Sequence, residues 1–474
     1  MSGLFHTLNI GSQSLFASRQ GVDTTGHNIA NAHTDGYSRQ RVNLKQRHPS
    51  EKQGILRGNG VFVYNITRAH NKFIERSLNR AKQDLGNSEA YHRELKGLEE
   101  VFSPELNITT DKEMSAFFNA AREVSNFPED LTVRTSFKES AINLAASFKR
   151  VDRDLNTRRN DINQKIVGHV GEINKLLKGI AKLNVTIQTA EAGEKQESGD
   201  LRDQQDRLLR SLSEKIAVEY YRGDMGMIVV RGPDEALFVD RDMSAELGAR
   251  VQENAGQLFE VVVNDTDGNR VSVISEANTA GELKALFNVR DERIPELMKH
   301  NNELAYTLAD RVNQIHRQGY GLNDYKETKG RNLFSLSEDM DNAAGSIEIE
   351  SAIWETTDAI SVAATPWAPG DNVLSNDIVR LETEKVLLND NATFNDYYAT
   401  YVGSYGLEVV RAGHVKEADE VSMNELKSKR EAISGVSMDE EAANLLKWQA
   451  NFTASSRVIT TVDEMLETVL SLKR

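Results

Sequence analysis

The chain has 474 residues, a net charge of −15 and no cysteine. This length allows two to four domains, and the acidity speaks against a nucleic-acid backbone as a partner. The lack of cysteine excludes disulfides, thiolate metal sites and cysteine nucleophiles, and no apolar run approaches the roughly 20 residues that span a bilayer.

Residues 3–32 are predicted to form the first helix. One stripe of this helix, which we call its seam, has mainly apolar or small residues at alternating steps of four and three. These residues are Leu4, Leu8, Gly11, Leu15, Ser18, Val22, Thr25 and Ile29. A period of 3.5 residues is typical of a coiled coil. The first 34 residues hold only Arg19 and Asp23 as charged side chains, although 27% of the chain is charged. We therefore expect this helix to be surrounded by protein on most sides.

The turn sequence at residues 34–37 ends this helix, and residues 37–65 have an extended pattern. Helical periodicity returns at about 68–102, 109–126 and 131–190, and residues 200–214 form a further amphipathic helix. The long segment at 131–190 has apolar residues at helical spacing, while Lys, Arg, Asn and Gln fill its other faces.

Residues 216–280 contain short apolar runs separated by Gly-Asp, Gly-Pro and Asp-Gly pairs, which indicates a small antiparallel β subdomain. Helix returns at residues 281–318 with a break expected near Pro295. Residues 324–375 lack periodicity and are expected to be irregular. Three further helices are predicted at 377–388, 395–410 and 418–434, and Ser437 with Glu440 forms a capping box for the last helix.

The last helix repeats the spacing of the first. Its seam consists of Met438, Leu445, Trp448, Phe452, Ser455, Ile459, Val462, Leu466 and Val469. Two such segments predict helices that pair with each other or with neighbouring copies. Gly11, Ser18 and Thr25 make the first seam weak, which leads to the hypothesis that both ends are frayed in the monomer and fold on assembly. The alternative is a terminal helix docked on its own domain.

The predicted fold is mainly α with a β insert: a long-helix bundle with discontinuous, coiled-coil terminal helices and a small antiparallel β subdomain. Four parts are expected: residues 1–36 with 435–474 as a terminal coiled coil, 37–215 with 281–323 and 376–434 as an elongated helical core, 216–280 as the β subdomain, and 324–375 as an irregular segment, at most a reduced outer domain. This order of parts places both termini at one end of an elongated molecule.

No catalytic, cofactor or metal site is predicted. The sequence has no phosphate loop, no dinucleotide fingerprint and no nucleophile elbow. Residues 265–269 faintly resemble a calcium loop, but Arg270 stands where such a loop requires glycine, so a hairpin turn is the better interpretation. His6, His27 and His33 lack the spacing of a metal-ligand pair.

Residues 28–40 (NIANAHTDGYSRQ) resemble the N-terminal signature of the axial proteins of the bacterial flagellum. The residues that carry the resemblance are Asn28, Ile29, Ala30, Asn31, Thr34, Gly36 and Tyr37. His33 departs from the signature, in which asparagine is commoner. The amide side chains can bond backbone groups at the helix end, and Gly36 supplies a free φ angle at the turn.

Three further segments, residues 200–209, 316–323 and 435–445, resemble the hook-associated protein 1 family, the hook–filament junction proteins. The resemblance implies a structural, non-enzymatic adaptor that leaves the cell by type III export without a cleavable signal peptide. It would polymerise into a short ring that joins hook to filament, outside the cell. Two alternatives remain: another axial protein of distal rod or hook type, and an intracellular coiled-coil scaffold.

The implied partners are further copies of the chain, the hook protein, a second junction protein on the filament side, and an export chaperone at the C-terminal helix. Nucleic acid and membrane insertion are not expected. The terminal helices would line an inner tube, and the expected subunit interface pairs one set of residues with another: Leu4, Leu8, Leu15, Val22 and Ile29 with Leu445, Phe452, Ile459, Leu466 and Val469.

Overall fold

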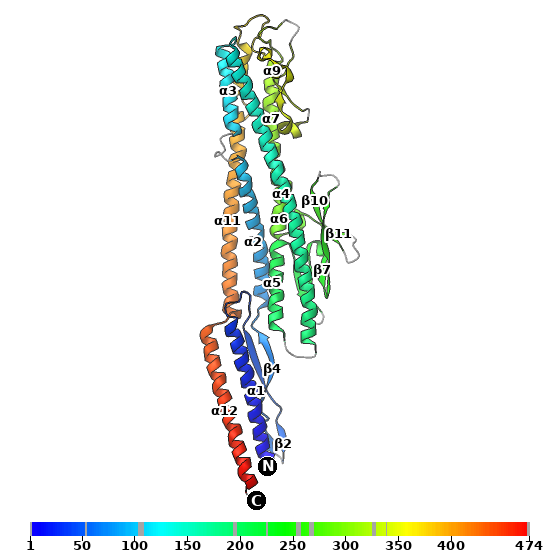
Figure 1. Cartoon of the computed structure of the whole chain (residues 1–474), viewed down its shortest axis with the longest axis vertical. Coiled ribbons are helices and arrows are strands. Elements are labelled where there is room, and N and C mark those ends of the chain that lie inside the picture. Colours follow the sequence, from blue (N-terminus) through cyan, green and yellow to red (C-terminus); the bar gives the residue numbers. More distant parts are fainter. Residues whose placement is uncertain are drawn as a thin grey trace.

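The computed structural model describes residues 2–52, 55–102, 109–192, 197–223, 226–252, 257–264, 270–324, 329–337 and 339–471. The molecule is long and narrow, and both chain ends lie at the same end of it (Figure 1). The predicted class, mainly α with a β insert, is confirmed.

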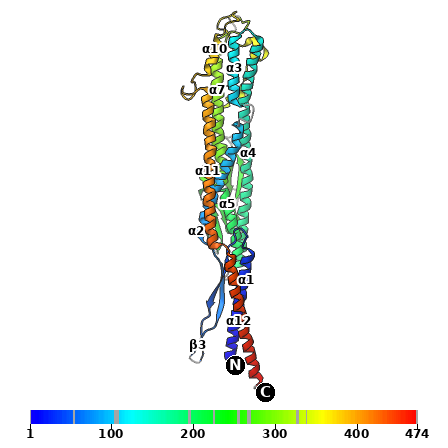
Figure 2. The ribbon, with the colours of Figure 1, turned by 90° about the vertical axis from the view of Figure 1, so that its left-hand side faces the viewer.

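The two terminal helices lie side by side and run antiparallel (Figures 1 and 2). They are α1 (Ser2–Ala30) and α12 (Met438–Ser471). The chain leaves α1 through the turn at Gly36, whose φ of 76° suits a residue without a side chain. The helices predicted at both ends are therefore confirmed.

A β hairpin runs along α1 on the side away from α12 (Figure 1). It consists of β1 (Gln40–Gln46) paired antiparallel with β4 (Val61–Arg68), and of the shorter pair β2 (Ser50–Lys52) and β3 (Ile55–Arg57). The His6 ring Nε2 lies 3.1 Å from the Gly58 carbonyl oxygen.

The expected division placed residues 37 onward in the helical core, and the hairpin within this range lies along α1. A two-stranded hairpin cannot bury a face by itself, so it needs a supporting helix. Helix α1 provides that support: a Cβ added at Gly60 would meet the Ile10 side chain at 3.4 Å.

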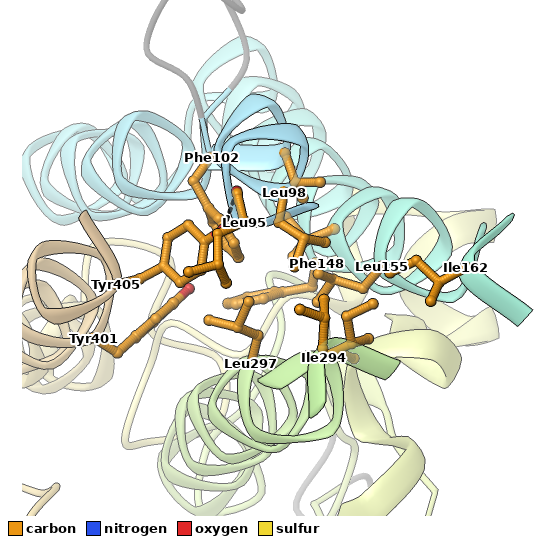
Figure 3. Packing of buried hydrophobic residues seen from close by; sticks show 14 of the residues in the cluster. Leu95, Leu98, Phe102, Phe148, Leu155, Ile162, Ile294, Leu297, Tyr401 and Tyr405 are labelled. Carbon is orange, nitrogen blue, oxygen red and sulfur yellow. Dashed lines mark hydrogen bonds between the residues drawn. The ribbon is translucent and has the colours of Figure 1, made fainter. Parts of the chain in front are cut away.

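The other half of the molecule is a bundle of long helices (Figures 1 and 2). Its members are α2 (Lys72–Glu99), α3 (Thr110–Asn126), α4 (Leu131–Glu191), α5 (Gly199–Lys215), α6 (Gly281–Asn288), α7 (Ile294–His316) and α11 (Phe394–Ser434). The 3-10 turn Glu100–Phe102 follows α2. Figure 3 shows how Leu95, Phe148, Leu297 and Tyr401 from four of these helices meet in the core.

Two predicted helix breaks are wrong. The chain passes from α6 to α7 through a π-helical turn, Val289–Arg293, which accommodates Pro295 without a break. The two helices predicted at 395–410 and 418–434 are the single helix α11. Helix α11 packs along α2, which supports it at Gly413: a Cβ there would lie 3.4 Å from the His92 ring.

The β subdomain comprises two antiparallel sheets beside α4. The first joins β5 (Glu219–Arg222), β6 (Ile228–Arg231), β7 (Leu237–Asp240) and β8 (Met243–Ser244), and the second has the order β11 (Arg270–Ile274), β10 (Phe259–Asn264), β9 (Glu246–Val251). Asn163, Asn174 and Asn184 of α4 attach these sheets. Each both donates to and accepts from strand or turn backbone at 2.8–3.1 Å.

Short elements form the tip of the molecule opposite the termini (Figure 1). They are β12 (Phe334–Ser335), α8 (Ala343–Ser346), β13 (Glu348–Ile349), α9 (Ser351–Glu355) and α10 (Val373–Leu381), with 3-10 turns at Met340–Asn342 and Thr357–Ala359. Strands β12 and β13 pair antiparallel. The segment expected to be irregular is thus a chain of small elements around the end of α7.

Candidate assembly interface

Helix α1 presents small residues to large ones on α12. A Cβ at Gly11 would lie 3.1 Å from Cγ1 of Ile459, so these helices approach closely there. At Gly21 a Cβ would overlap the Trp448 ring. Gly11, which weakens the first seam, and Gly21 therefore create the space that the α12 side chains fill.

Polar contacts alternate with these apolar ones along the seam. The Ser455 hydroxyl donates to Ser14 Oγ at 2.7 Å, and the Asn28 amide donates to Glu441 Oε2 at 3.0 Å. The contact residues Glu441, Trp448 and Ser455 are seven residues apart, as a coiled-coil seam requires. The terminal pair therefore has a defined register within the chain.

The ten residues expected at the subunit interface have different environments. Five on α1 and three on α12 are half-buried: Leu4, Leu8, Leu15, Val22, Ile29, Leu445, Ile459 and Leu466. Phe452 and Val469 are 38% and 40% exposed. Two of the ten meet α1 residues outside the expected set: Ile459 lies against Gly11, and Leu466 lines a groove with Phe5. Trp448 was already part of the predicted seam of the last helix, whereas Gly21 and Ser14 were not singled out from the sequence.

Large apolar side chains remain open to solvent on the terminal pair. The most exposed are Phe5, Phe16, Leu446, Met465 and Leu470, each more than half exposed. Apolar surface of this kind on paired helices is typical of a protein–protein interface. Outside the α1–α12 seam and the contact of α1 with the hairpin, the terminal pair thus leaves large apolar side chains exposed in the single chain.

The signature residues lie where the terminal pair joins the bundle. Asn28 is buried, and its side-chain Oδ1 accepts from the Tyr37 hydroxyl at 2.8 Å and from the Gln40 amide at 2.9 Å. Its Nδ2 donates to the Gln40 carbonyl at 2.9 Å as well as to Glu441. One amide therefore ties together the end of α1, the start of the hairpin and the start of α12.

A second set of contacts fixes the hairpin start to α12 and α11. Arg39 donates through Nε to Glu441 Oε1 at 2.7 Å and through Nη1 to Glu440 Oε2 at 2.6 Å. The Arg39 amide donates to the Ser434 carbonyl, the last residue of α11, at 2.8 Å. Glu441 is 2% exposed; Arg39 neutralises its buried charge, and Asn28 donates a hydrogen bond to it.

Two arginine-centred clusters complete this region. Arg430 donates to Glu75 at 3.0 Å and to the Gly36 carbonyl at 2.8 Å, and Arg210 donates to the other oxygen of Glu75 at 3.1 Å. We call the whole region the waist: residues 28–40 with the start of α2, α5, the end of α11 and the start of α12.

The other cluster of the waist surrounds Arg68. Its guanidinium donates to Asp203 at 2.7 Å and to Asp206 at 2.6 Å, while Asp203 also accepts from the Ser38 amide at 2.7 Å. Burial raises the pKa of the Asp203 carboxyl, and Arg68 and Ser38 oppose that rise. These buried charges fix the direction in which the terminal pair leaves the bundle.

Three of the four sequence segments that carried the family resemblance meet at the waist: 28–40, 200–209 and 435–445. The fourth, 316–323, lies at the opposite end, where His316 is completely buried. Glu75 and Arg430 were not identified from the sequence. Each is a charged residue within an amphipathic helix, and in the sequence such a residue cannot be distinguished from one that is exposed to solvent.

Within the described part of the chain, no three His, Cys, Asp or Glu residues are placed to hold a metal ion. The loop at 265–269 lies outside the described residues. His27 contacts the Tyr37 hydroxyl at 3.0 Å and His33 is exposed. None of the described helices is both long enough and apolar enough to cross a membrane.

Comparison with known proteins agrees with this architecture. Residues 95–334, just over half of the chain, match the family described as "Flagellar hook-associated protein FlgK helical domain". The chain belongs to this family. Residues 428–472 match a second family, "Flagellar basal body rod FlgEFG protein C-terminal". The hook-associated family consists of structural flagellar proteins and is not an enzyme family, and the chain is a flagellar component.

Relatives of the hook-associated family match over nearly their whole length. Flagellar hook-associated protein 1 of Bacillus subtilis is 24% identical, with 99% of each chain covered. That of Salmonella typhimurium is 22% identical over 98% of this chain and 99% of its own. The structure of the flagellar hook junction protein FlgK from Burkholderia pseudomallei superimposes with a TM-score of 0.67 at 13% identity, covering 75% of this chain and all of the other, and supports the fold.

Proposed function

We propose that this chain is the structural adaptor between hook and filament, polymerising into a short ring after type III export. Membership of the hook-associated family supports this function. The observation that carries it is the terminal pair: two antiparallel helices at one end of a long molecule, with Phe16, Leu446 and Leu470 unpartnered. An isolated soluble chain gains nothing from such a surface, whereas a polymer buries it.

The partners follow from the two unlike polymers that an adaptor joins. Copies of this chain form the ring, the hook protein lies on one side, and a second junction protein lies on the filament side, all outside the cell. Before export, a chaperone covers the open apolar face of α12, which otherwise invites premature assembly. The relatives' names support the junction role, and the rod-type match at residues 428–472 supports contact with other axial components.

The terminal pair forms the inner tube, with the bundle and β subdomain outside it. We assign the ten residues of the expected interface to contacts within and between copies, since eight are half-buried and two remain open in the single chain. The ends fray in the isolated monomer and become fully ordered in the ring. Strong amide protection of residues 2–34 in the monomer would contradict this ordering.

Charge placed on this surface tests the assignment. Leu15→Asp and Phe452→Asp should each abolish assembly, because a carboxylate would be buried without a partner. The bundle should remain folded, since neither residue belongs to its core. Circular dichroism checks the fold, and electron microscopy of flagella checks assembly. A normal ring with either variant would refute the assignment.

Deletion of the gene tests the function itself. Electron microscopy of the deletion strain should show bare hooks, and immunoblotting should find flagellin lost to the medium. Missing hooks would instead support a distal rod or hook subunit, the second candidate, which the match of residues 428–472 to the rod family favours. Normal flagella would contradict both. Protein retained in the cell, with nothing in sheared flagella, would favour an intracellular scaffold.

A further inference from the structure

The hairpin on α1 is strongly basic in an acidic chain. Residues 40–68 contain six basic side chains and one acidic one. Arg41, Lys45 and Arg47 are exposed, and none of them takes part in an ion pair of the described residues. Lys45 lies 3.3 Å above the Tyr64 ring and Arg47 lies 5.8 Å from the Phe62 ring centre. Their charges are thus held in place by aromatic rings and remain unneutralised.

An acidic groove lies on the other side of α1. It is lined by Phe5, Asp463, Leu466, Glu467 and Leu470, so it combines two carboxylates with exposed apolar surface. Phe5 is 56% exposed and Leu470 is 62% exposed. Within the described residues, neither carboxylate has an ion-pair partner.

The basic hairpin and the acidic groove lie at the same height along the terminal pair. Arg47 borders a hollow with His6, and Phe5, the preceding residue of α1, borders the groove. Helix α1 lies between the two features (Figure 1), so they cannot meet within one chain. A neighbouring copy that lies beside the first, without a large shift along the long axis, places its acidic groove next to the basic hairpin of the first copy.

We propose that the hairpin of one copy docks against the acidic groove of the next, with Lys45 and Arg47 facing Asp463 and Glu467. The contact is head-to-tail, so each copy offers both halves and the pattern repeats around a ring or helix. It rests on the proposed function only in requiring that copies lie side by side.

The opposite charges at this contact favour assembly of the acidic copies. Copies with a net charge of −15 repel one another, which opposes assembly. A local contact of opposite charge offsets that repulsion and selects one register between neighbouring copies. The apolar rim of Phe5 and Leu470 then becomes buried beside the ion pairs.

Charge reversal with a swap tests the proposal. Lys45→Glu/Arg47→Glu and Asp463→Lys/Glu467→Lys should each lower the number of attached filaments in a complemented deletion strain about tenfold. The fourfold variant, with both reversals, should recover. Lys182→Glu/Lys299→Glu makes the same charge change as the hairpin variant at exposed positions of the helical bundle, and should behave like the wild type. The groove variant leaves the hairpin untouched, so hairpin misfolding cannot explain its loss.

Failure of the swap to restore attachment would overturn the proposal, as would reversals that match the Lys182→Glu/Lys299→Glu control. Either result would leave the junction function intact, provided that the deletion strain still gives bare hooks. A deletion strain with attached filaments would instead remove the proposed function.

The natural absence of cysteine permits a direct readout of the partner. A chain with Arg47→Cys and Glu467→Cys together, treated with a short bis-maleimide in isolated flagella, should give a ladder of cross-linked copies of this chain. Each single variant should give none. Mass spectrometry identifies the linked chains, and cross-links from Arg47→Cys to a different axial protein would overturn the second copy as the occupant.

Discussion

The side chain of His316, at the end of α7, links two other segments of the chain through Ser361 and Arg331. The completely buried ring accepts from the Ser361 amide at Nε2 over 2.8 Å, so the proton is on Nδ1, which lies 2.8 Å from the Arg331 carbonyl oxygen. Burial lowers the pKa of His316 to about 4. A protonated ring would lose the bond from Ser361, which explains why the neutral form is required.

We predict that this histidine makes the protein less stable in acid. Its folded pKa lies below the unfolded value of about 6.5, so the unfolded chain binds the extra proton first. The stabilisation is complete above about pH 6.5 and is lost as the pH falls towards about 4, up to about 3 kcal/mol. Thermal unfolding of His316→Gln should depend less on pH than that of the wild type. His33→Gln, at an exposed position, should not differ; equal pH dependence for His316→Gln would contradict the assignment.

Asn28 holds the waist through both ends of its amide. Asn28→Asp places a carboxylate where Nδ2 donates to Glu441, and should weaken the attachment of α1 by about 1–3 kcal/mol. Hydrogen exchange should then become faster in α1 and α12 and remain unchanged in α4. Asn31→Asp, the same change in the same signature but bonded to the His27 carbonyl, is the control. Equal exchange in both variants would show that the Asn28 amide does not hold the joint.

At the scale of elements, the sequence predicted helices whose periodicity is strong. The two terminal seams, the helix at 131–190 and the β insert all appear. The sequence placed the asparagines of α4 with Lys, Arg and Gln on its non-apolar faces, whereas Asn163 and Asn184 are buried against strand backbone. Periodicity cannot distinguish an amide that meets water from one that meets a peptide group, because both faces are polar.

The docking of the hairpin and the contacts of the waist were beyond prediction for a different reason. The hairpin meets α1 through residues as far apart in sequence as His6 and Gly58, and the waist joins segments as far apart as Asn28 and Glu441. No local pattern reports which charges converge after folding. Helix α11 was predicted as two helices, whereas it is continuous where it packs along α2, a contact that no local pattern reports.

The glycines of α1 allow a clean comparison. Gly21→Ala should weaken the terminal pair, since the new methyl group overlaps the Trp448 ring, at a cost of about 1–3 kcal/mol. Gly26→Ala has nothing within 4 Å and should stabilise the helix by up to about 1 kcal/mol. Filament attachment and hydrogen exchange of α12 measure the effect of each of the two variants. A Gly21→Ala variant that performs as well as Gly26→Ala would show that the close approach does not matter.

For the whole molecule, the waist separates a self-sufficient bundle from a terminal pair that is incomplete alone. The bundle has a continuous apolar core, whereas the terminal pair keeps Phe5, Phe16 and Leu446 in solvent. A chain built in this way can be exported, remain unassembled, and complete its surface only where neighbours are present. The partners that we propose at the hook–filament boundary would be such neighbours.

The position of the chain in the flagellum tests this account most directly. Because the chain has no cysteine, Lys182→Cys or Lys299→Cys introduces a single exposed thiol on the bundle that a maleimide-gold particle can mark. Electron microscopy of isolated hook–filament complexes should show gold confined to a narrow band at the boundary, and unmodified protein should give none. Gold spread along the hook, the rod or the filament would contradict the junction assignment.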